Sequence, residues 1–95
     1  MATTYIVSYD LRKSRNYPLM YKALDTLKAA KLLESLWLVT LAPNVGAIRL
    51  RDAIMSAARM DGDDGLIVIE LKKTSDWATY NAQKTGLAWL RANIP

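Results

Sequence analysis

The chain has 95 residues, with no cysteine and no histidine, and its 13 basic and 9 acidic residues give a net charge of +4. The length predicts one domain, and the missing residue types exclude disulfides, thiolate chemistry and histidine as general base or metal ligand. Any catalysis must therefore use carboxylates, hydroxyls and cations, and the positive charge permits an anionic partner such as DNA or RNA.

The first part of the chain predicts a strand followed by a helix. Residues 3–11 (TTYIVSYDL) alternate and are rich in β-branched and aromatic residues, which is typical of a strand that ends near Asp10. The polar break RKSRN follows, and Pro18 then stands where a helix tolerates proline, in its first turn. One buried helical face is predicted by the spacing of Met20, Ala23, Leu24 and Leu27.

The middle block, KLLESLWLVTL over residues 31–41, is long for one strand. It is either one bent strand or a hairpin that turns near Glu34–Ser35, and we favour the hairpin because the block has about twice the length of a typical strand. A helix with a buried stripe is predicted next, and MDGDDG ends it. The continuous apolar run LIVIEL, residues 66–71, is typical of a buried strand.

The tail, residues 74–95, is predicted to be helical. Ser75–Asp76 is a cap signal, and Leu87, Leu90 and Ile94 have helical spacing, whereas Gly86 weakens the middle and allows two short helices instead. The order predicts an α+β, ferredoxin-like β-α-β-β-α-β core with an antiparallel sheet over residues 1–73. Residues 74–95 are a C-terminal helical extension of the same domain. A single strand at 31–41 would instead give a small parallel β-α-β-α-β sheet.

Three features carry a resemblance to a known family: Tyr9–Asp10 at the end of the first strand, Ser35–Leu36–Trp37 in the second β block, and MDGDDGLIVIEL, an acidic turn before an apolar strand. Because these features occur in this order and spacing, the chain resembles the small CRISPR adaptation proteins, which are the non-integrase subunit of the spacer-acquisition complex. It also resembles the related VapD-type ribonucleases. The resemblance covers roughly residues 3–73. The tail and Lys31–Leu32–Leu33–Glu34 depart from the family pattern, which points to a stand-alone relative.

The resemblance implies a homodimer in which Asp10 of each subunit faces its mate across a two-fold axis. A divalent cation, Mg²⁺ or Mn²⁺, would lie between the two carboxylates and support endonuclease activity, with Asp10 as both metal ligand and catalytic residue. Hard cations do take oxygen ligands and keep several waters. From the residues alone, an Asp at a strand end is more often the cap of a loop.

The residues beside Asp10 are candidates for contact with nucleic acid. Arg12, Lys13 and Arg15 are expected to bind phosphates, and the alternative is a solvated loop. The Tyr9 ring is a candidate for stacking on a base, although alternating aromatic residues on strands belong more often to the core.

Two further functions compete with nucleic-acid binding: a non-catalytic dimeric scaffold, and a small-molecule-binding regulatory domain. A dimer is expected from the small size, the 52% hydrophobic content and a tryptophan, Trp89, that lies off the predicted helical stripe. No apolar run approaches the ~20 residues of a membrane span, and the first residues lack the pattern of a secretory signal. A cytoplasmic location is therefore expected.

Overall fold

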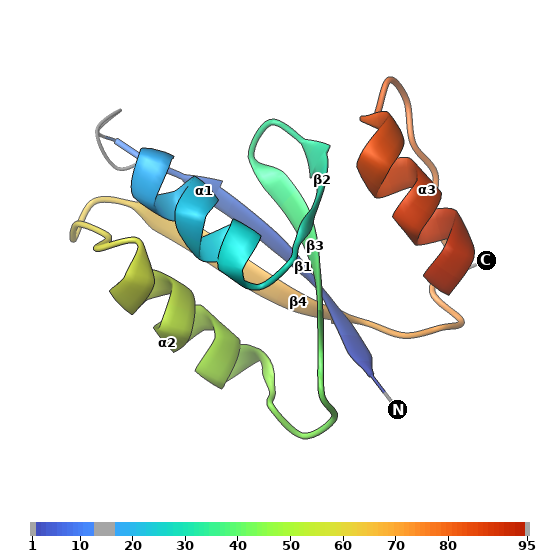
Figure 1. Cartoon of the computed structure of the whole chain (residues 1–95), viewed down its shortest axis with the longest axis horizontal. Coiled ribbons are helices and arrows are strands. Elements are labelled where there is room, and N and C mark those ends of the chain that lie inside the picture. The colour runs from blue at the N-terminus through green and yellow to red at the C-terminus, as the bar shows by residue number, and fades with distance from the viewer. Residues whose placement is uncertain (1, 13–16, 95) are drawn as a thin grey trace.

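A four-stranded antiparallel sheet forms the centre of the computed structural model, which describes residues 2–12 and 17–94 (Figure 1). Its strands lie in the order β2-β3-β1-β4. Each neighbouring pair is antiparallel, with Val7 opposite both Trp37 and Val68. The strands are β1 Thr3–Asp10, β2 Ala30–Leu33, β3 Leu36–Leu41 and β4 Gly65–Leu71.

The predicted hairpin is confirmed. β2 and β3 pair with each other, and the chain turns at Glu34–Ser35, the only polar pair in this apolar block. The Lys31 amino group lies 2.9 Å from the Glu34 carboxylate and so ties the turn to its own strand. Because of this turn the chain forms four antiparallel strands and not a three-stranded parallel sheet.

Two helices cover one face of the sheet: α1, Tyr17–Thr26, and α2, Ala47–Ala57 (Figure 1). Alternation along β1 directs every second side chain to that face. The buried residues between the sheet and these helices form the main core, which includes Tyr5, Val7, Tyr9, Met20, Leu24, Trp37, Val39, Leu50 and Ile54.

The third helix, α3, Lys84–Asn93, packs on the opposite face, against β2 and β3. It begins nine residues after the cap signal at Ser75, because residues 72–83 first cross the sheet as irregular chain. Trp77 anchors this crossing by donating a hydrogen bond from its indole Nε1 to the Ile94 carbonyl. A second core of Ala30, Leu32, Leu38, Leu90 and Ile94 lies beneath α3.

The prediction that residues 66–71 form a buried strand is wrong. β4 is an edge strand, and its Ile67 and Ile69 side chains are 54% and 48% exposed. The reason is uneven cover: α2 packs on one face of β4, while α3 lies over β2 and β3 and leaves the other face of β4 open. We call the side of the sheet that carries Ile6, Ile67 and Ile69 the α3 face. Within residues 2–12 and 17–94, no helix has the length and apolar character needed to cross a bilayer.

Candidate functional site

Asp10 lies at the exposed end of β1, where its partner across the ladder is Gly65 at the start of β4. Its side chain is 68% exposed, and one carboxylate oxygen lies 3.4 Å from the Arg12 guanidinium. Alternation along β1 places Asp10 on the α3 face, together with Ile6 and Ser8. The carboxylate is therefore accessible, and within the described residues its ion pair is with Arg12.

Arg12 joins the end of β1 to the turn before β4. Its main-chain N–H donates to an oxygen of the Asp64 carboxylate at 2.8 Å, and its Nε donates to the Asp63 carbonyl at 3.0 Å. With the Asp10 ion pair, Arg12 therefore contacts three acidic residues at this corner. This role was not apparent from the sequence, because two of these partners, Asp63 and Asp64, are more than 50 residues away along the chain.

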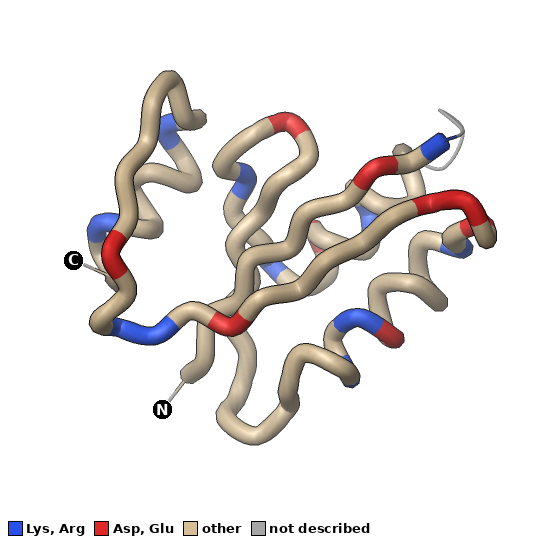
Figure 2. The backbone as a smooth tube through the Cα atoms, turned by 180° about the vertical axis from the view of Figure 1, so that it is seen from behind, with Lys and Arg blue, Asp and Glu red and all other residues tan. Residues whose placement is uncertain are grey.

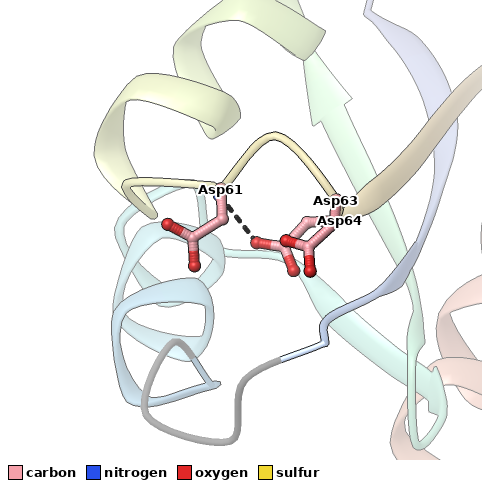
Figure 3. A group of neighbouring side chains, drawn as sticks. All are labelled: Asp61, Asp63 and Asp64. Atoms are coloured by element: carbon pink, nitrogen blue, oxygen red, sulfur yellow. Dashed lines mark hydrogen bonds between the residues drawn. The ribbon is translucent and has the colours of Figure 1, made fainter.

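The turn before β4 gathers three carboxylates, those of Asp61, Asp63 and Asp64 (Figure 3). One oxygen from each lies within 4.8 Å of the others. The Asp61 main-chain N–H donates to Asp64 at 2.8 Å, so part of this acidic turn is explained by its own hydrogen bonding. The DGDDG run signals the cluster in the sequence, and the pairing of Gly65 with Asp10 places it beside the end of β1.

The Tyr9 ring belongs to the core. Only 5% of the residue is exposed, and its hydroxyl accepts a hydrogen bond from the Trp37 indole Nε1 at 3.0 Å. Burial raises the pKa of Tyr9 to about 12. Tyr17, Tyr21 and Trp37 continue a row of rings from Tyr9, with neighbouring centroids 6.0–6.2 Å apart. Tyr9 therefore packs in the core, and its ring is not available to stack on a base.

The basic residues form no single patch over the described part of the chain. Figure 2 shows Lys and Arg spread along several elements, with acidic residues among them. Lys31 is paired with Glu34 and Arg51 with Asp52. Two of the three cations predicted to bind phosphate, Lys13 and Arg15, lie outside the described residues.

A hollow of about 320 Å³ lies beside α3, between the sheet and the crossing chain. Its lining is mostly apolar and includes Leu33, Leu36, Trp77 and Tyr80. Such a volume is at the lower end of small-ligand sites, which usually also present several polar groups that orient the ligand. The polar residues of the lining are Ser75, Asp76, Thr79 and Tyr80, all from the crossing chain. They define no pattern specific to one kind of ligand, so the hollow indicates no chemical class of ligand.

The element order, the antiparallel sheet and its strand order define a ferredoxin-like α+β fold. A solved structure described as a hypothetical protein, TT1823, from Thermus thermophilus has this fold: its TM-score is 0.65 at 18% identity, over 87% of this chain and 96% of that chain. No protein-family model matches the sequence, and no curated protein matches it either.

Proposed function

We propose that the protein is a homodimeric, cytoplasmic nucleic-acid-binding protein whose Asp10 holds a divalent cation, Mg²⁺ or Mn²⁺, for phosphodiester cleavage. The observation that carries this proposal is the position of Asp10. It is an accessible carboxylate at a strand end, next to an acidic turn, and the cationic run Arg12–Lys13–Arg15 follows it in the chain. A carboxylate that would hold the metal and cations that would bind phosphate are thus neighbours in one segment of the sequence.

The Asp10 carboxylate suits a hydrated cation. Mg²⁺ keeps several waters and is commonly held by one or two carboxylates, so a group that is 68% exposed can take part without a closed cage. A cation there would polarise a phosphate oxygen and lower the pKa of a bound water. Arg12, 3.4 Å from Asp10, competes with the cation for the same carboxylate. Phosphate binding by Arg12 would relieve that competition.

The metal is tested by Asp10→Asn. In the wild type we expect Mn²⁺ at 100 times its Kd to stabilise the fold by about 2.7 kcal/mol through mass action, and to support cleavage of a mixed single-stranded RNA or DNA. Both effects should be lost in Asp10→Asn, because the amide has no negative charge for the cation. Calorimetric scans with and without Mn²⁺ and a gel assay of cleavage measure them.

Asp63→Asn is the matched control, since it removes an exposed acid from the neighbouring turn and leaves Asp10 intact. It should respond to Mn²⁺ as the wild type does. Loss of the response in Asp63→Asn, with retention in Asp10→Asn, would assign the cation to the turn. An equal response in wild type and Asp10→Asn would contradict the proposed role of Asp10.

The basic loop is tested by the dependence of nucleic-acid affinity on salt. Each phosphate contact contributes about 0.9 to the slope of log affinity against log salt for a duplex and about 0.7 for a single strand. Replacing Lys13 and Arg15 with alanine should therefore lower the slope by up to about two, measured by fluorescence anisotropy. Arg12 is left in place because it also holds the turn before β4.

The control for the loop is a double replacement of Lys84 and Arg91, exposed cations on α3. α3 packs against β2 and β3, on the face of the sheet opposite α1 and α2, so the slope should stay at its wild-type value. If the slope is the same in all three proteins, the loop makes no phosphate contacts and is simply exposed to solvent. Absence of any binding would favour the alternative function, a non-catalytic dimeric scaffold.

A further inference from the structure

The outer edge of β4 presents main-chain groups that no other strand of the described chain pairs. β4 is last in the sheet order. The Tyr9 N–H donates to Ser35 on the β3 side, so alternation directs the main chain of Tyr5, Val7 and Tyr9 to β3 and that of the even-numbered residues to β4. Gly65, Ile67, Ile69 and Leu71 therefore bond to β1. The N–H and C=O groups of Leu66, Val68 and Glu70 point outward.

This edge lacks the features that usually prevent strands from pairing between molecules. Natural edges are kept short, bulged, charged or covered. The other edge strand, β2, has four residues, an irregular register, a Lys31–Glu34 ion pair and α3 against it. β4 has seven residues, no proline, no irregularity in its register and one charged residue, Glu70. Its exposed Ile67 and Ile69 add an apolar strip beside the free main chain.

We propose that a second copy of the chain pairs with this edge, antiparallel, with the two-fold axis at Val68. Val68 then lies opposite Val68 of the second copy, and Leu66 lies opposite Glu70. All outward N–H and C=O groups of these residues would be paired. On the α3 face, Ile67 of each copy lies opposite Ile69 of the other, where β-branched cross-strand neighbours stabilise a ladder.

Charge complementarity selects this register. Extending the pairing by one residue beyond each strand end places Lys72 opposite Asp64, twice by symmetry. A register centred on Ile67 would place Glu70 opposite Asp64, two like charges. A register centred on Ile69 would place Lys72 opposite an uncharged residue, Leu66. The centre at Val68 is the one of these three that matches Lys72 with an acid and leaves Glu70 opposite an apolar residue.

This inference deepens the proposed function and rests on its homodimer, but it separates the two Asp10 carboxylates. Asp10 is level with Gly65, three residues from the axis, and β1 is one strand further out than β4. With ~3.4 Å per residue and ~4.8 Å between strands, the two carboxylates lie about 25 Å apart. Each subunit would then bind its own cation beside its own acidic turn, unlike the shared metal that the family resemblance implies.

Disulfide trapping tests the register, and the chain has no cysteine to interfere. A mixture of the Ile67→Cys and Ile69→Cys proteins should form a cross-linked dimer under mild oxidation, since a directly opposed pair has Cα atoms about 4.5–5.5 Å apart. Each variant alone should remain uncross-linked, because residues two positions off register are about 8 Å apart, beyond disulfide reach. Non-reducing gels give the fraction trapped.

A second test blocks the edge without touching the core. Glu70→Pro removes one outward N–H, which the β1 ladder does not use. Glu70→Ala removes the same charge and keeps the N–H. By analytical ultracentrifugation at micromolar concentration, we expect the wild type and Glu70→Ala to be dimers. Glu70→Pro should be a folded monomer, with its circular dichroism spectrum unchanged.

The outcomes separate this inference from the proposed function. A dimer that survives Glu70→Pro, or that gives no cross-link in the mixture, would overturn edge pairing and leave the homodimer in place. Cross-linking of Ile67→Cys alone would indicate a different register or packing through the α3 face, and would also overturn it. A wild-type mass of 10.6 kDa at every concentration would overturn both the edge pairing and the proposed homodimer.

Discussion

Replacing Gly86 with alanine is expected to lower the free energy of unfolding by about 3 kcal/mol, the upper end of the usual cost of an overpacked core. Gly86 lies in the first turn of α3, where the helix meets the main chain of β2. A Cβ at this position would lie 2.6 Å from the Leu32 Cα and 2.8 Å from the Lys31 carbonyl carbon, and nearer still to the Lys31 oxygen. These are main-chain atoms, so the helix itself must move. Urea denaturation measures the loss.

The sign of this change is diagnostic. If Gly86 were only a poor helix former, alanine would stabilise the helix by about 1 kcal/mol. Gly62→Ala is the matched control, because a Cβ there would meet nothing within 4 Å, and its free energy of unfolding should stay close to the wild-type value. An increase in stability for Gly86→Ala would contradict the close approach of α3 to β2.

The second large effect is a loss of stability at high pH through Tyr9. Burial raises the pKa of this phenol to about 12 in the folded protein, from 10 in the unfolded chain. The unfolded chain therefore releases the proton first. The stability contributed by this shift is fully present below about pH 10 and is lost as the pH rises through 12, in total about 2.7 kcal/mol at about 1.36 kcal/mol per unit of pKa shift. Equilibrium unfolding in urea at pH 8, 10, 11 and 12 follows this loss.

The difference in stability between the wild type and Tyr9→Phe should depend on pH. At pH 8 the variant should be less stable than the wild type by about 1–3 kcal/mol, because the buried Trp37 indole loses its acceptor. Between pH 10 and 12 this difference should shrink, since phenylalanine has no proton to release. Tyr80→Phe is the control: Tyr80 is 88% exposed, so its loss should not change stability at pH 8. A constant difference between wild type and Tyr9→Phe up to pH 12 would contradict the shifted pKa.

Periodicity predicted most of the fold, because it records which faces of local elements are buried. The length of the block at residues 31–41 predicted the hairpin and Glu34–Ser35 marked its turn, while the stripe from Met20 to Leu27 predicted a helix found at Tyr17–Thr26. The position of LIVIEL at the sheet edge could not be predicted in this way. An apolar run in the sequence does not tell whether its side chains are covered by a helix of the same chain or by another molecule. Gly86 was assessed as a weak helix residue, because its contact with β2 is 54 residues away along the chain.

The candidate site was only partly predictable for the same reason. Strand-end placement of Asp10 and the acidic composition of DGDDG are local properties, and both could be read directly. Their meeting at one corner depends on the pairing of β1 with β4, and so does the role of Arg12 between them. Alternation along β1 shows which residues share a face with Tyr9, but it does not show which face is covered. The ring is buried because α1 and α2 cover its face.

The division into two cores gives the molecule a hierarchy of cooperative units. The main core draws its buried residues from residues 5–58, whereas the second core depends on Leu90 and Ile94 near the C-terminus. α3 is joined to β4 by the irregular chain 72–83 and can separate by subglobal opening, while β1 remains paired with β3 and β4. Such an opening would uncover Leu32 and Leu38 on the same face of the sheet as the already exposed Ile67 and Ile69. Docking of α3 therefore determines how much apolar surface this side of the sheet presents to other molecules.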